Sequence, residues 1–95
     1  MTPDSRVACA HFRVRGLVQG VFYRASTEAM ARRLGLKGWV RNGENGEVEL
    51  VACGAVPQLD ELEKWLWQGP ASAKVSDVQR APAAIQVFNR FEVRG

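Results

Sequence analysis

Hydrophobic and polar residues alternate along the first part of the chain, which is typical of a β-strand with one buried face. The alternation runs from Val7 to Arg15. One side of it carries Ala8, Ala10, Phe12 and Val14, and the other carries Cys9, His11, Arg13 and Arg15. We therefore predict a half-buried strand with the first set facing the core. His11 has no obvious catalytic partner, so we interpret it as a solvated or structurally bonded residue rather than a base.

Two later segments repeat their apolar residues at helical spacing. The first runs from Phe22 to Leu34 and is stopped by Gly35. Its apolar face consists of Tyr23, Thr27, Met30, Ala31 and Leu34. The second helix is spaced by Val56, Leu59, Leu62 and Leu66. Pro57 suits its entrance, and Gly69-Pro70 ends it.

The remaining segments are predicted as strands. Leu36 to Asn42 and Glu47 to Cys53 form a hairpin, because the asparagines and glycines of residues 42–46 tolerate positive φ in a turn. A fourth strand is predicted near Val75 to Arg80 and a last one at Phe88 to Val93.

The first six of these elements follow the order β-α-β-β-α-β and the last strand completes the pattern, which predicts an α+β fold of the ferredoxin-like class, an antiparallel sheet with two helices packed on one face. With 95 residues and 46% hydrophobic composition, the chain fits one compact domain. We assign that domain to residues 7–95 and predict a flexible N-terminal tail over residues 1–6.

The two cysteines fall on neighbouring strands of this topology. The first and third strands lie side by side and antiparallel, so Cys9 and Cys53 are expected to be near neighbours on the same face. A cross-strand disulfide is geometrically possible, whereas a reducing cytosol opposes it, and both states stay open. Two cysteines and a single histidine are too few for a metal site of the Cys/His type.

The charge of the chain favours a small anionic partner. The formal net charge is +3, and the basic residues are scattered rather than gathered in a stripe, which argues against a nucleic-acid partner. Residues 1–5 lack the pattern of a signal peptide, and no apolar run approaches the length of about 20 residues that spans a membrane. The sequence therefore predicts a cytoplasmic protein that does not contact a membrane.

Candidate chemistry lies between the first strand and the first helix. This segment has the pattern of a strand end, a turn and the start of a helix, with the sequence Gly16-Leu17-Val18-Gln19-Gly20-Val21-Phe22-Tyr23-Arg24. Inward-pointing backbone N–H groups, a helix N-terminus and an arginine would together cradle an anion. By itself this pattern is also compatible with a tight connection that has a solvated arginine. A second segment, Gly38-Trp39-Val40-Arg41-Asn42-Gly43, ends an apolar strand with an amide that could orient a water molecule.

These two segments resemble the signatures of the acylphosphatase family. The resemblance continues through Gly46 to Glu49 and Gly69 to Val75, and it covers nearly the whole chain from about Val7 onward. Tyr23 departs from the family pattern, which usually has phenylalanine before its arginine, and its hydroxyl needs a partner if it is buried.

The resemblance implies hydrolysis of acyl phosphates to a carboxylate and inorganic phosphate, without a cofactor or metal. Arg24 and Asn42 would be the catalytic residues, Arg24 holding the phosphoryl oxygens and Asn42 the attacking water. The phosphate-binding loop would consist of Gly16, Leu17, Val18, Gln19, Gly20 and Val21. The enzyme is expected to be a monomer with a small acyl phosphate as its substrate.

Two other functions compete with this one. Acylphosphatase-like domains also occur within larger proteins, so a non-catalytic phosphate-binding accessory module is the main alternative. RNA binding on the open sheet face requires a platform of aromatic residues. The outward positions of the predicted central strands carry Cys9, His11, Arg13, Glu47, Glu49 and Val51 instead.

Overall fold

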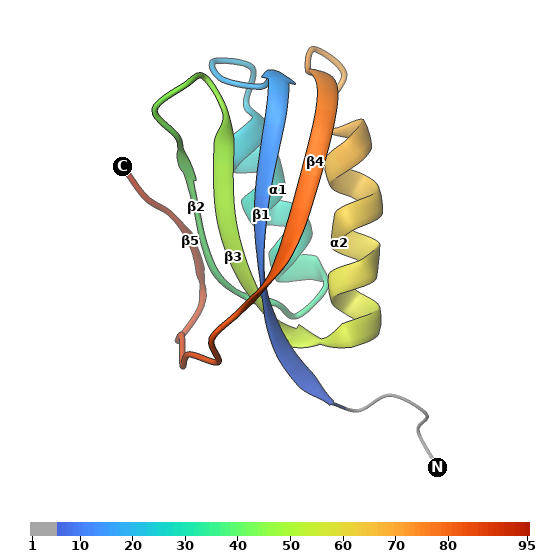
Figure 1. Cartoon of the computed structure of the whole chain (residues 1–95), viewed down its shortest axis with the longest axis vertical. Helices are drawn as coiled ribbons and strands as arrows, with labels where there is room; N and C mark the ends of the chain where they lie inside the picture. Colours follow the sequence, from blue (N-terminus) through green and yellow to red (C-terminus); the bar gives the residue numbers. More distant parts are fainter. Residues whose placement is uncertain (1–5) are drawn as a thin grey trace.

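The computed structural model describes residues 6–95. It consists of a curved five-stranded sheet with both helices packed on one face (Figure 1). The elements are β1 (Val7–Leu17), α1 (Tyr23–Arg33), β2 (Lys37–Asn42), β3 (Val48–Ala55), α2 (Val56–Gln68), β4 (Lys74–Ala83) and β5 (Phe91–Val93). The β-α-β-β-α-β order of the ferredoxin-like class is confirmed for the first six elements, and β5 follows as a seventh. The predicted tail lies outside the described residues except for Arg6, whose carbonyl accepts a hydrogen bond from the N–H of Val56.

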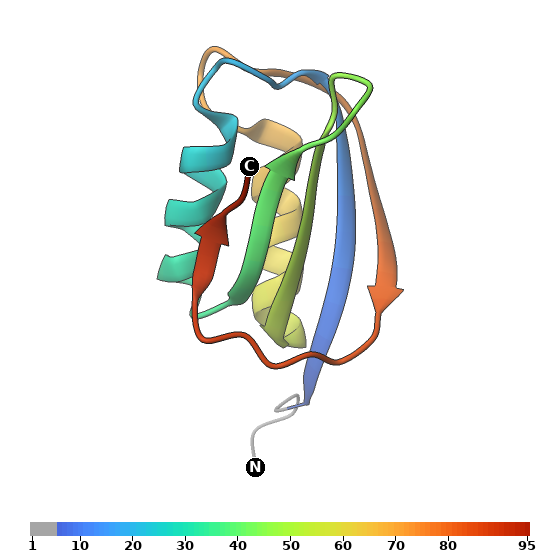
Figure 2. The same ribbon diagram turned by 90° about the vertical axis from the view of Figure 1, so that its left-hand side faces the viewer.

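The strand order is β4-β1-β3-β2-β5, and β1, β2, β3 and β4 pair antiparallel as predicted. β5 instead runs parallel to β2, so the complete sheet is mixed rather than wholly antiparallel. The reason is topological. After β4, residues 84–90 cross the end of the sheet and join its opposite edge in the direction of β2 (Figure 2).

Several strand boundaries differ from the prediction. β1 extends past Arg15 to Leu17, because the pairing with β4 resumes after an irregularity between Arg15 and Gly16. β4 extends to Ala83, and β5 begins only at Phe91.

The predicted alternation decides which residues enter the core. Phe12 and Val14 of β1 are fully buried in the main core, together with Leu50 of β3 and Leu59 of α2. The predicted inner face of the first helix is likewise buried or half-buried. Within residues 6–95, neither helix has the length and apolar character needed to cross a membrane.

A buried tyrosine links the two helices. The carbonyl of Leu66 lies in the last turn of α2, where its usual helical donor would be the N–H of Pro70, and proline has none. The hydroxyl of Tyr23 in α1 donates to this carbonyl instead. The ring centroids of Tyr23 and Trp65 are 5.6 Å apart. A Cβ on Gly69 would lie 2.6 Å from the edge of the Tyr23 ring. The tyrosine that departs from the family pattern thus satisfies a carbonyl that the proline leaves unpaired.

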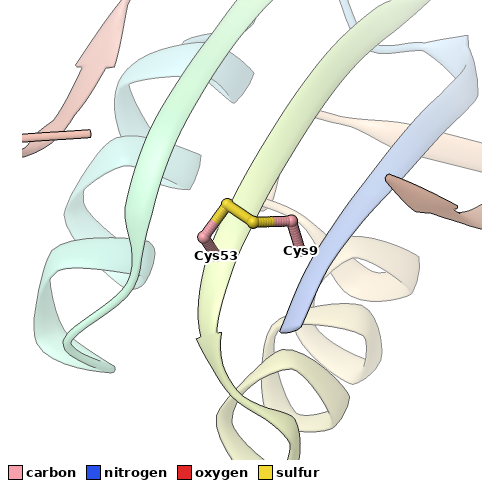
Figure 3. Close-up of a disulfide and its surroundings, with 2 residues drawn as sticks. All are labelled: Cys9 and Cys53. Atoms are coloured by element: carbon pink, nitrogen blue, oxygen red, sulfur yellow. A yellow bond between two sulfur atoms is a disulfide. The ribbon is translucent and has the colours of Figure 1, made fainter. Parts of the chain in front are cut away.

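A disulfide joins the two central strands on the face opposite the helices (Figure 3). Cys9 and Cys53 are directly paired in the register of β1 and β3, which confirms that they are neighbours, and their Cα atoms are 4.0 Å apart. Both are buried, because Trp39 and Phe88 pack against them. This cluster forms a small second core on the outer face of the sheet.

Replacement of Tyr23 by phenylalanine is expected to lower the free energy of unfolding by about 1–2 kcal/mol, because it leaves the buried carbonyl of Leu66 without a donor. Urea unfolding followed by circular dichroism measures the change. An unchanged midpoint would show that another group satisfies this carbonyl.

The same variant has a second readout at alkaline pH. Burial raises the pKa of Tyr23 above its ordinary value of 10.0. The unfolded chain therefore loses this proton first, so the stability that Tyr23 provides is complete below pH 10 and falls as the pH rises toward the folded pKa. The loss of stability above pH 10 should be shallower in Tyr23→Phe than in the wild type.

Reduction of the disulfide is expected to lower the free energy of unfolding by about 2–4 kcal/mol, because the bond closes a segment with a sequence separation of 44 residues. Urea unfolding with and without dithiothreitol measures this. The double variant Cys9→Ala/Cys53→Ala should be insensitive to the reductant. Two titratable thiols in the unreduced, unfolded protein would contradict the bond.

Candidate functional site

The β1–α1 connection begins later than the sequence suggests. Gly16 and Leu17 pair with Val75 and Lys74 as the last residues of β1, so the free loop comprises only residues 18–22. Gly16 adopts φ 129°, and a Cβ there would lie 2.1 Å from the carbonyl oxygen of Lys74. The glycine therefore serves a close approach of two strands rather than a turn around a ligand.

The loop is held in place from both sides. Val18 is buried in the main core, and the side-chain amide of Gln19 donates to the carbonyls of Gly43 and Glu47 at 3.2 and 2.8 Å. Gly20 lies between these anchors and the helix, with φ 73° and open space where a side chain would be. The loop is thus fixed against the β2–β3 hairpin while its glycine stays accessible.

The N-terminus of α1 lacks the usual capping groups. Phe22 occupies the N-cap position without a side-chain hydrogen bond, and the first turn contains no acidic residue. Arg24 is instead the second residue of the helix, although a cation is unfavourable at the positive end of a helix dipole. Local helix stability alone does not favour this arrangement, whereas a bound anion would.

Arg24 also lacks a partner in the part of the chain that the structure describes. It is half-buried, and among residues 6–95 it makes no ion pair or hydrogen bond. The other cations in this part of the chain that lack an acidic partner are all exposed, namely Arg33, Lys37 and Lys74. Arg24 is therefore the partly desolvated cation whose donors remain available.

A cavity of about 310 Å³ lies at this helix start. Its lining residues come from the loop, the first turn of α1 and the end of β5, namely Gly20, Phe22, Tyr23, Arg24, Ala25 and Val93. Figure 2 shows that the chain after β5 runs alongside β2 toward the end of the sheet that carries the β1–α1 loop. The cavity combines a guanidinium and a helix N-terminus with apolar side chains.

Asn42 is the last residue of β2, at the same end of the sheet as the loop. Its side-chain oxygen is buried and has no hydrogen-bond partner among the described residues. Asn42 lines a different cavity from Arg24, one of about 440 Å³ at the β2–β3 turn. Gln19 connects the two regions, since it belongs to the loop before Arg24 and its amide binds the residue after Asn42. The sequence did not assign this role to the side chain of Gln19.

The outer face of the sheet carries a separate network of charges. Nε2 of His11 lies 2.6 Å from a carboxylate oxygen of Glu49, and Arg41 contacts the other oxygen of that carboxylate at 2.9 Å. The hydrogen bond from His11 is the main cause that lowers the pKa of Glu49, and Arg41 adds to it. His11 is thus structurally bonded, as predicted. Across residues 6–95, no three His, Cys, Asp or Glu side chains gather in a way that could hold a metal ion.

Known proteins resemble this chain in both sequence and fold. A family model described as Acylphosphatase matches residues 10–93. An acylphosphatase of Nitrosococcus oceani is 46% identical over 88 residues, which cover 93% of this chain and 99% of that protein. An acylphosphatase of Xanthomonas oryzae pv. oryzae is 54% identical over 82 residues, 86% of this chain and 93% of that one.

The fold agrees with a solved relative as well. The structure of an acylphosphatase from Coxiella burnetii matches with a TM-score of 0.91 and 43% identity, over 99% of this chain and 100% of that chain. The likeness thus extends over nearly the full length in both sequence and fold. The chain belongs to the acylphosphatase family.

Proposed function

We propose that this chain hydrolyses acyl phosphates, the mixed anhydrides of carboxylic and phosphoric acids, and that Arg24 and Asn42 are its catalytic residues. The observation that carries this proposal is Arg24, a half-buried cation at the uncapped start of α1 that has no partner among residues 6–95. Membership of the acylphosphatase family supports the reaction class.

The phosphoryl group binds between the loop and the helix start. The guanidinium of Arg24 donates two charge-assisted hydrogen bonds to its oxygens, a fork geometry that lysine does not offer. The backbone N–H groups of residues 18–21 and the first turn of α1 complete the cradle. Gly16 and Leu17 belong to β1, so they support this loop and border the phosphate cradle at its edge.

Asn42 holds the attacking water. A buried amide oxygen is almost always hydrogen-bonded, and water is the partner where the protein supplies none. The side-chain oxygen of Asn42 is buried without a partner among the described residues, so it can accept a hydrogen bond from water. The hydrogen bonds from Gln19 to the carbonyls of Gly43 and Glu47 hold the β2–β3 turn, and with it Asn42, beside the phosphate loop.

The reaction is an in-line displacement at phosphorus. The water oxygen forms the new P–O bond as the bond from phosphorus to the acyl oxygen breaks, and the carboxylate leaves with the electron pair. One water hydrogen stays on the new P–OH group and the other passes to a phosphate oxygen. Because a carboxylate is a good leaving group, the transition state is loose, and positioning with charge stabilisation is sufficient. No cofactor, metal or protein nucleophile takes part in this mechanism.

We also propose a cytoplasmic monomer that acts on a small substrate and does not bind nucleic acid. A cavity of about 310 Å³ suits a small molecule. Ion pairs such as Arg13 with Glu47 and Arg41 with Glu49 neutralise the outer sheet face, which supports the absence of a nucleic-acid partner. The burial of the disulfide, which shields it from exchange, is compatible with a reducing compartment.

The alternative of a non-catalytic module is not favoured, since the named relatives match over nearly their whole length.

Replacement of Arg24 by alanine is expected to lower kcat at least about 100-fold and to weaken competitive inhibition by inorganic phosphate, because the forming charge loses its main donor. Release of phosphate from benzoyl phosphate, with a chelator present, measures the change. Arg33→Ala is the matched control, since Arg33 is an exposed arginine of the same helix and has no acidic partner in the described part of the chain. Wild-type turnover by Arg24→Ala would exclude this arginine from the reaction.

Replacement of Asn42 by alanine is expected to lower kcat about 100-fold while leaving inhibition by phosphate nearly unchanged, because the phosphate cradle does not include this side chain. Asn45→Ala, an exposed asparagine in the adjoining turn, should retain wild-type rates. If Asn42→Ala kept its kcat, the water-orienting role would be wrong. If it lost affinity for phosphate instead, Asn42 would belong to the cradle.

A further inference from the structure

Phe22 has an unusual combination of conformation and exposure. Its backbone adopts φ 61° and ψ 20°, and within residues 6–95 it is the one non-glycine residue with positive φ. Bulky side chains rarely occupy this region, which glycine and asparagine tolerate far better. The side chain is 80% exposed, so the aromatic ring adds little to the hydrophobic core.

No structural role in the described part of the chain explains the ring. Phe22 makes no side-chain bond at the helix cap, and its neighbours Val21 and Tyr23 are the residues that turn inward. The fold needs the left-handed backbone at this point, but it does not need an aromatic side chain there. The ring is therefore free for a role at the surface.

The position of Phe22 indicates what that role is. It lines the 310 Å³ cavity together with Gly20 and Arg24, and Val93, 39% exposed, is a second apolar member of the same lining. The polar part of the cavity fits a phosphoryl group. The apolar part has no counterpart in a phosphoryl group, whereas an acyl phosphate has an acyl group next to its phosphorus.

We propose that Phe22 and Val93 form an apolar wall that binds the acyl group of the substrate, so that acyl phosphates with an aromatic or branched apolar acyl group are preferred over acetyl phosphate. This inference rests on the proposed function, since it requires the phosphoryl group at Arg24. The acyl group leaves the solvent and packs against the ring, and the gain scales with its apolar area. Acetyl phosphate has a single methyl group to bury and gains little.

The test compares kcat/KM for benzoyl phosphate and acetyl phosphate in the wild type and in Phe22→Asn. Asparagine tolerates the left-handed backbone and lacks the ring, so the variant should fold. We expect kcat/KM for benzoyl phosphate to fall about two- to tenfold through KM, which is the range of one aromatic contact. The value for acetyl phosphate and the inhibition by inorganic phosphate should change less than about twofold.

Two further variants separate specificity from general damage. Phe22→Tyr keeps the ring and should keep the preference for benzoyl phosphate. Val87→Asn also introduces an asparagine in place of an exposed apolar residue, one that is 94% exposed and outside the cavity, and it should leave the kinetics with both substrates unaffected.

The outcomes distinguish this inference from the function on which it rests. Equal changes for the two substrates in Phe22→Asn, or no change for either, would overturn the acyl wall while leaving the hydrolase intact. Absence of turnover of both substrates by the folded wild type would overturn the proposed function and the acyl wall together.

Discussion

The antiparallel register between β1 and β3 determines where every proposed functional group lies. It pairs Val14 with Val48, so β1 ends beside the start of β3 and its loop emerges next to the β2–β3 turn. Only this register brings Gln19 within reach of the carbonyls of Gly43 and Glu47. A slip by one residue would turn Phe12 and Val14 outward and move the loop away from Asn42. The burial of the inner face therefore fixes the site indirectly, through a register that the core enforces.

Locally unfavourable features gather at the end of the sheet that carries the loop. Phe22 has a left-handed backbone, which costs about 1–3 kcal/mol for a bulky residue. Arg24 opposes the helix dipole, and the buried amide oxygen of Asn42 has no partner within residues 6–95. Beside them, the buried hydroxyl of Tyr23 is satisfied, since it donates to the carbonyl of Leu66 that Pro70 cannot pair with. Such a concentration of exceptions is typical of a site whose partner is a ligand.

The sequence predicted the elements well because their signals are local. The alternation from Val7 and the helical spacing around Leu59 depend only on neighbouring residues, and the structure confirms both. The parallel pairing of β5 depends on the path of residues 84–90 around the sheet, which no local pattern records.

The site was predicted in the same uneven way. Arg24 and Asn42 were identified from sequence motifs. The position of Gly16 within a strand, in contrast, depends on how closely Lys74 approaches it. The anchoring role of Gln19 depends on a contact with a hairpin more than 20 residues away in sequence, as its hydrogen bond to Gly43 shows. Long-range contacts of this kind decide how a motif is oriented, and a single sequence does not contain them.

The simplicity of this site is consistent with the reaction proposed for it. A poor leaving group would require a general acid, and a weak electrophile would require an activated nucleophile. Around Arg24 the described cavity lining contains no carboxylate or histidine that could play either part. A substrate whose leaving group is already a stabilised carboxylate needs neither, and one guanidinium with oriented N–H groups can stabilise a loose, metaphosphate-like transition state. Positioning and charge stabilisation at Arg24 are therefore sufficient for the activated anhydrides that we propose as substrates.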